Sequence, residues 1–338
     1  MKSTRSKTRQ TVVLVWRQLV AIARTTHVEC MQQPAVMLLL MGGVIATAMI
    51  PLLQFHQFGE AGRLARDGAL AYQLTLGLVL AVVAASQAIH GEIESGTASA
   101  AISKPLTREA FVIGKFAGVV SMLTQFWFIL LAAMLIAERV TYRLSEIEGQ
   151  TLGITDDRAQ AFLLLAVPVA LAIAGLLHNL RRVRFCLAAC RILLVILAIG
   201  LVAAFCFDRA GTWHPSPTNI DLRIVPASLL IFMALVLFAA IASALSTRLK
   251  AGGAMTCCLL LLLLGLAADT LLAPTSPAWI RLPARLLPNI QSFWLCDALT
   301  AGGTVDTGYL LAAILYGCAG SAVAILLGLL AFRRRDIN

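Results

Sequence analysis

The sequence predicts an all-α polytopic membrane protein, and three observations lead to this fold class. Of its 338 residues 59% are hydrophobic and only 13% are charged, whereas soluble domains carry about 25% charged residues. The apolar residues gather in windows of roughly 20, the length of a helix that crosses a ~30 Å hydrocarbon core. The basic residues collect in alternate connecting segments. This pattern accounts for the net charge of +10 without a nucleic-acid partner.

The first element is a basic leader, residues 1–34, which ends in an amphipathic helix. Within residues 11–26, Arg17 and Arg24 lie on one helical face, and an apolar set lies on another. The apolar set is Val13, Trp16, Val20 and Ala23. Such a helix lies at the bilayer interface, with its basic residues towards anionic headgroups. A continuous extension of the first span is the alternative, but Pro34 interrupts it.

About eight spans follow, within a transmembrane domain of residues 35–332. We place them at 35–55, 70–90, 110–137, 161–178, 185–207, 224–245, 254–273 and 307–332. The fourth and fifth windows are separated only by the short link HNLRRVR (178–184). No connecting segment has the 50 residues that a small folded soluble domain needs. The outer segment 274–306, rich in proline and containing two tryptophans, is expected to lie along the membrane surface.

The charge distribution predicts that both termini are cytoplasmic. With the N-terminus inside, the inner segments hold seventeen lysines and arginines and five acidic residues, a net charge of +12. The outer segments hold nine arginines and eleven acidic residues, a net charge of −2. This asymmetry follows the positive-inside rule. It requires an even number of spans, because residues 333–338 form a second basic segment that belongs on the same side as the leader.

Catalytic and metal-binding patterns are missing from the sequence. It contains no HExxH and no GxSxG, and its cysteines and histidines lack metal-ligand spacing. A phosphate-binding loop is excluded at IGKF (113–116), because Glu109 replaces the first glycine and Phe116 replaces the Mg²⁺-ligating Ser or Thr. We therefore predict no catalytic residue, no metal site and no cofactor bound by this chain.

One acidic residue, Asp269, falls within a predicted span. Acidic groups inside the membrane are candidates for function, so Asp269 is a candidate intramembrane polar site. Its position near the outer end of the seventh span favours the alternative, a carboxylate hydrated at the interface.

Residues 91–108 form the one polar, glycine- and proline-punctuated insert on the cytoplasmic side. Gly91 and Gly96 allow a sharp change of direction after the second span, and Pro105 ends a short helix that starts at Thr97. The charged residues on its two sides are Glu92 and Glu94, then Lys104 and Arg108. A compact knob of small side chains with a charged rim is suited to insertion into a cleft of a partner protein. A re-entrant or merely connecting loop is the alternative.

The string ExESGTASAAISKPLTREAFVIGKF resembles the segment after the second span of ABC-2 type transporter permeases, and it is similar to that of the copper-processing permeases. The closing region LPNIQSFWLCDALTAGG (287–303), with the last span and its FRRRDI end, resembles the same family. The residues that match the family's coupling segment are Glu92, Glu94, Gly96, Thr97, Ser103, Lys104, Pro105, Arg108, Phe111, Gly114 and Lys115.

This resemblance implies a permease subunit of the bacterial inner membrane, paired with a second copy or a homologous permease. It implies that separate ATP-binding subunits hold ATP and Mg²⁺ and seat the coupling segment. Family members commonly have six spans, so six is the alternative count here, with the fourth and fifth windows as an addition. Two rival functions are a non-transporting membrane anchor of a multi-protein complex and an intramembrane enzyme. The enzyme requires facing acids and histidines within spans, which are nearly lacking. The substrate and the direction of transport are open.

Overall fold

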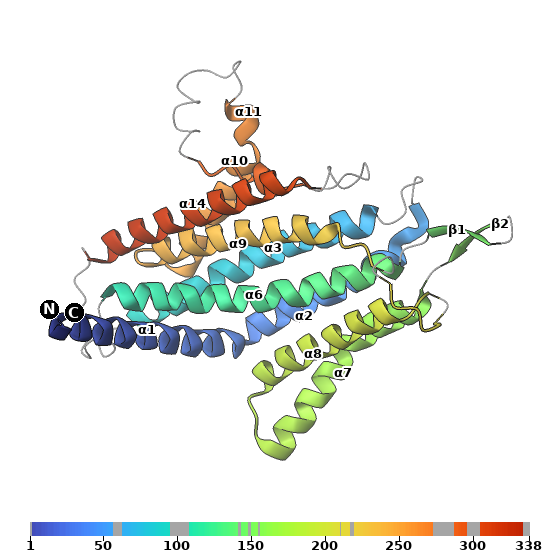
Figure 1. Ribbon diagram of the computed structural model, residues 1–338, viewed down its shortest axis with the longest axis horizontal. Helices are drawn as coiled ribbons and strands as arrows, with labels where there is room; N and C mark the ends of the chain where they lie inside the picture. The colour runs from blue at the N-terminus through green and yellow to red at the C-terminus, as the bar shows by residue number, and fades with distance from the viewer. Residues whose placement is uncertain are drawn as a thin grey trace.

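The protein is a bundle of long helices that run side by side (Figure 1). A computed structural model describes residues 2–56, 63–94, 108–140, 143–147, 150–154, 156–209, 211–216, 220–272, 287–295 and 305–333. In this part of the chain, seven helices are long and apolar enough to cross a membrane. The fold is therefore the all-α polytopic membrane fold that the sequence predicts.

The membrane helices match the predicted windows closely. The chain runs through α1 (Lys2–Met31), α2 (Pro34–Met49), η1 (Ile50–His56), α3 (Arg63–Ser86), η2 (Gln87–Gly91), α4 (Glu92–Glu94), α6 (Arg108–Val140), β1 (Arg143–Ile147), β2 (Gln150–Ile154), α7 (Asp157–Arg181), α8 (Phe185–Cys206), α9 (Ile224–Ser246), α10 (Ala251–Leu266), α11 (Ala268–Leu272), η4 (Gln291–Phe293) and α14 (Thr307–Arg333). Seven of the eight windows are long helices. The seventh window is the shorter α10, which a turn at Ala267 joins to α11.

The first residues of α1 and the last residues of α14 lie at the same end of the bundle (Figure 1). This is the arrangement that an even number of crossings requires; α10 has 16 residues and is shorter than the seven long helices, so the eighth crossing stays a prediction. We refer to this end as the cytoplasmic end, following the predicted charge asymmetry.

The fourth and fifth windows are separate helices. The break lies at Arg182, whose left-handed backbone (φ 51°) ends α7 and donates an N–H bond of 2.9 Å to the His178 carbonyl. The hairpin of α7 and α8 diverges from the bundle towards this link (Figure 1). Leu176 and Leu180, near the link, are accordingly exposed. A single interrupted span is thus excluded.

A short antiparallel hairpin at the outer end was not predicted. Strands β1 and β2 pair with Arg143 opposite Ile154 and Ile147 opposite Gln150. The sequence signal was weak, because each strand has only five residues.

The centre of the bundle is formed by α3, α6 and α9, and it contains one polar node. Gln73 of α3 is fully buried; its amide donates to the Ser228 carbonyl at 2.9 Å and accepts from the Ser228 hydroxyl at 2.8 Å. The Trp127 indole N–H donates to the same hydroxyl at 2.9 Å. Because each buried polar group here has a partner, the node joins the three helices without an unpaired group in the hydrocarbon region.

Ion pairs join the helices at the outer end. Arg139 of α6 donates to Asp156, the N-cap of α7, at 2.6 Å, and both side chains are about 95% buried. Arg223 holds Asp221 through two hydrogen bonds of 2.9 and 2.7 Å. Burial raises the pKa of Asp221, but these bonds and the nearby charge of Arg66 lower it by more, so its pKa lies below its usual range.

Candidate functional site: the base of the coupling segment

Helix α1 packs directly on the cytoplasmic half of α6. A Cβ atom added to Gly114 would lie 2.8 Å from the side chain of Ile22, and one added to Gly118 would lie 2.7 Å from the Ala23 carbonyl oxygen. Only glycine permits this separation of the two helices. The signal for it was present in the sequence, because GKFAG (114–118) is a G-x-x-x-G motif, the pattern that brings membrane helices close together.

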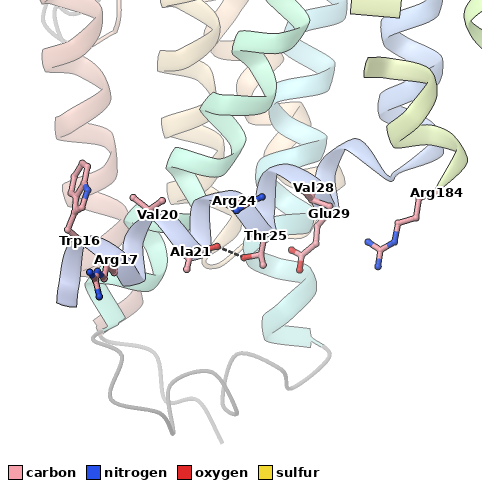
Figure 2. Close-up of a pocket in the computed structure, with 9 residues that line it drawn as sticks. All are labelled: Trp16, Arg17, Val20, Ala21, Arg24, Thr25, Val28, Glu29 and Arg184. Atoms are coloured by element: carbon pink, nitrogen blue, oxygen red, sulfur yellow. Dashed lines mark hydrogen bonds between the residues drawn. The ribbon is translucent and has the colours of Figure 1, made fainter. Parts of the chain in front are cut away.

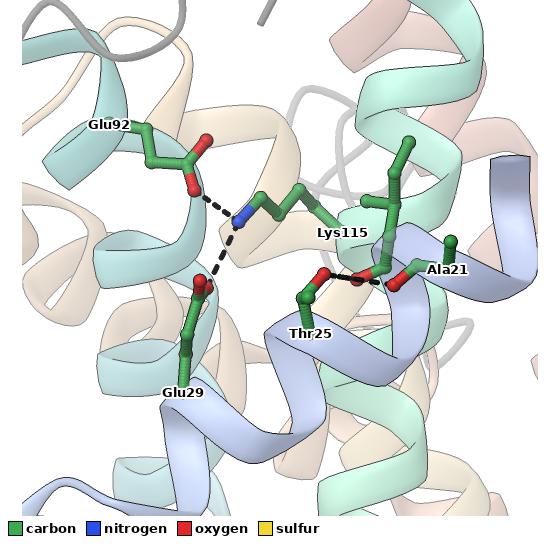
Figure 3. A network of polar contacts seen from close by, with 6 residues as sticks. Ala21, Thr25, Glu29, Glu92 and Lys115 are labelled. Carbon is green, nitrogen blue, oxygen red and sulfur yellow. Dashed lines mark hydrogen bonds and ion pairs between the residues drawn. The ribbon is translucent and has the colours of Figure 1, made fainter.

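Lys115 lies between these two glycines and is only 4% exposed. Its Nζ is 3.3 Å from Oε2 of Glu29 on α1 and also contacts Oε1 of Glu92 on α4 (Figure 3). The same ammonium group lies 5.9 Å from the centre of the Phe111 ring. We call Lys115, Glu29 and Glu92 the lysine node. A buried ammonium needs such partners, because an unpaired charge there is very costly.

The entrance to the coupling segment differs from the prediction at Gly91. The sharp turn expected there is absent: the second span continues through a π-helical turn, Gln87–Gly91, at least to Glu94, the last residue described before 108. Glu92 therefore faces the interior and pairs with Lys115, whereas we had placed it on an outward rim. Single π-helical turns of this kind are frequent at functional sites.

Glu94 remains on the surface, as predicted for a rim residue. Its carboxylate lies 3.4 Å from Nζ of Lys250, the N-cap residue of α10, and 3.9 Å from Nε2 of His90. The side chains of Glu94 and Lys250 are 64% and 79% exposed. Exposed pairs contribute less than about 1 kcal/mol, so Glu94 is available for a partner.

An apolar contact ties the same region to the last span. Phe111 of α6 stacks on Phe332 of α14 with ring centres 6.2 Å apart. Val112 belongs to this buried cluster, and Ile93 of α4 and Leu329 of α14 pack against it. The two ends of the coupling segment are thus connected to four helices: α1 and α6 through the lysine node, α10 through Glu94, and α14 through this cluster.

The structure brings together only part of the predicted site. Glu92, Glu94, Phe111, Gly114 and Lys115 lie within one region. Five predicted residues fall outside the described residues: Gly96, Thr97, Ser103, Lys104 and Pro105. The first residue of α6 is Arg108, whose side chain is likewise outside the described part. Sequence reasoning missed Glu29 and Lys250, which lie far from the segment along the chain.

Asp269 is a separate feature, on α11, which projects from the side of the bundle (Figure 1). It is exposed on α11 and accepts a 2.9 Å hydrogen bond from the Asn289 amide. The carboxylate is thus exposed and has Asn289 as a partner, and both the intramembrane site and the hydrated interfacial carboxylate stay predictions.

The closing region lies close to Asp269. Ile290 and Phe293 are each 1% exposed, and the Ile290 N–H donates to the Gly265 carbonyl at 3.2 Å. The described residues 287–295 thus pack into the bundle, whereas we had expected the whole of 274–306 to lie along the membrane surface.

A comparison with protein families supports the resemblance that the coupling segment shows. The model of the ABC-2 family transporter protein matches residues 35–203, half of the chain. The chain belongs to the ABC-2 transporter family. A comparison with curated proteins gave no match. The matched region includes the second and third spans with Glu92 and Lys115, so the base of the coupling segment lies inside the family domain. Membership makes the chain a multi-pass membrane subunit of an ABC transporter.

Proposed function

We propose that this chain is the permease subunit of a bacterial inner-membrane ABC transporter and that residues 91–108 couple it to a separate ATP-binding subunit. The ATP-binding subunit would bind ATP and Mg²⁺, and two permease copies, or one copy and a homologous permease, would form the pathway. The permease would move its substrate across the membrane or out of it. The observation that carries this proposal is the set of contacts that joins the base of the segment to α1, α6, α10 and α14.

These contacts supply a physical route for coupling. A displacement of residues 95–107 by a partner would act on Glu92 and Glu94 at one end and on Arg108 at the other. Because Lys115 links Glu92 to α1, and Phe111 links α6 to α14, the displacement would move these helices together. Close-packed helices transmit such shifts rather than absorb them.

The proposal is tested by capture of the ATP-binding subunit encoded next to this chain. Glu94→Arg reverses the charge of an exposed residue, and Gly96→Val restricts the backbone conformations available to the segment between α4 and α6. We expect both variants to reach the membrane at normal levels and to lose either the bound ATP-binding subunit or the stimulation of its ATP hydrolysis. Rim charges act mainly on association and are screened by salt, so the loss for Glu94→Arg should be largest at low salt and smaller at high salt.

Thr151→Arg, in strand β2 at the outer end, is the matched control, and it should behave as wild type. If both coupling variants retain and stimulate the ATP-binding subunit normally, the coupling assignment is wrong. A role as a non-transporting membrane anchor would then explain the family membership better.

A further inference from the structure

A groove of about 850 Å³ runs along the exposed face of α1 at the cytoplasmic end. Residues of α1 from Trp16 to Glu29 form its floor, and Arg184, the residue before α8, stands across from them (Figure 2). The wall containing Arg184 exists because the α7–α8 hairpin diverges from the bundle at this end. The groove is therefore a product of the tertiary structure, since its two sides are 155 residues apart in the sequence.

The groove combines positive charge with apolar surface. Arg17, Arg24 and Arg184 line it, and none of the three forms an ion pair within the described part of the chain. The one acidic residue of the lining, Glu29, is engaged by Lys115. Next to the arginines, the indole of Trp16 is 66% exposed. The groove thus presents three available guanidinium groups beside an open aromatic ring.

The position of the groove matches the headgroup level of a membrane. Arg184 directly precedes a membrane span, Phe185–Cys206, and α1 ends just before another, Pro34–Leu53. Exposed apolar side chains continue from the groove along the hairpin, including Val183 and Leu180. Tryptophan and arginine at such a boundary are typical of the bilayer interface.

We infer that this groove binds the headgroup of an anionic phospholipid from the cytoplasmic leaflet. Arg24 and Arg184 pair with the phosphate group, since guanidinium and phosphate form charge-assisted hydrogen bonds. Arg17, about 10 Å from Arg24 along α1, adds attraction for the negative charge. The acyl chains extend over the exposed apolar face of α7 and α8. Basic pockets beside membrane helices on the cytoplasmic side are known to select such lipids. A soluble acidic protein segment would satisfy the arginines but would leave the apolar side of the groove uncovered.

The inference is tested on the purified permease alone, by native mass spectrometry with added phosphatidylglycerol, and so does not depend on the coupling proposal. The test variant is Arg24→Gln with Arg184→Gln, two exposed side chains whose loss leaves the packing of α1 intact. Removing each charge should weaken binding about fivefold, so the double variant should bind about 30-fold more weakly. Phosphatidylcholine, the neutral comparison, should be retained by neither protein.

Arg181→Gln is the matched control, because Arg181 lies in the same link but does not line the groove. It should change phosphatidylglycerol binding by less than about twofold. The inference is overturned if the double variant binds phosphatidylglycerol like wild type, or if Arg181→Gln weakens binding equally, which would indicate a diffuse basic surface. It is also overturned if glycerol 3-phosphate binds as tightly as the lipid. Loss of a captured ATP-binding subunit with unchanged lipid binding would assign the groove to that protein instead.

Discussion

Replacing Lys115 with methionine should loosen the entrance to the coupling segment. Methionine keeps most of the side-chain volume but removes the ammonium that joins Glu92 to Glu29. The Lys115 and Glu92 side chains are 5% and 25% exposed, so their pairing lies between the exposed and buried limits. Exposed pairs contribute less than about 1 kcal/mol, and breaking a buried pair costs about 3–5 kcal/mol. We therefore expect a loss of about 2 kcal/mol at the node.

Hydrogen exchange measures this loss locally. Opening of the helix end at residues 87–94 should become about 30-fold more frequent, because each tenfold change corresponds to about 1.36 kcal/mol. Peptides that cover 287–295, which contact Gly265 and Tyr316 and not the lysine node, should exchange as in wild type. Glu29→Gln is the graded comparison: the Glu29 side chain is 57% exposed, so its loss should cost about 0.5 kcal/mol and speed exchange only about twofold.

Two results would refute this reasoning. Equal exchange of residues 87–94 in wild type and Lys115→Met would mean that the lysine node does not hold the segment. A larger effect of Glu29→Gln than of Lys115→Met would mean that the exposed carboxylate of Glu29, and not the buried ammonium of Lys115, contributes most of the stabilisation.

Three further predictions concern packing and ion pairs. Gly118→Ala should displace α1, because a Cβ there would lie 2.7 Å from a carbonyl oxygen of α1. Trypsin should then cut α1 faster than in wild type. The control Gly42→Ala adds a Cβ that meets nothing within 4 Å, so it should not change the cleavage rate. Arg139→Met should lower the unfolding temperature in detergent and reduce the free energy of unfolding by about 3–5 kcal/mol, because it leaves the Asp156 carboxylate buried and unpaired. Adding Asp156→Leu removes that charge and should recover most of the lost stability. If the double variant recovers nothing, the unpaired carboxylate is not the cause of the loss. The lowered pKa of Asp221 means that its ion pair stabilises the fold above the usual carboxyl pKa of about 4 and is lost as the pH falls through the lower folded-state value. The stability difference between wild type and Asp221→Asn should therefore be constant near neutral pH and shrink below about pH 4, and a difference that grows on acidification would be the contrary result.

The sequence by itself determined the approximate bounds of most spans, since seven of the eight predicted windows are long helices. A run of about 20 apolar residues is a local property, and a bilayer permits few structures other than a helix across it. The windows at 185–207 and 224–245 coincide almost residue for residue with α8 and α9. The break at Pro34 was likewise local, since proline cannot continue the hydrogen bonds of α1. The coupling segment was recognised from a contiguous string for the same reason.

Only the tertiary structure decided which residues meet. Leu38 is 65% exposed and Leu40 is fully buried on the same helix, although both are leucines in one apolar run. In a soluble protein, polarity would distinguish these two faces, but lipid and protein interior are equally apolar, so hydropathy carries no signal for burial within the membrane. The same limit applies to the lysine node: nothing local to Lys115 indicates that it selects Glu29, 86 residues away. The close approach of α1 to α6 at two glycines is what places that carboxylate within reach.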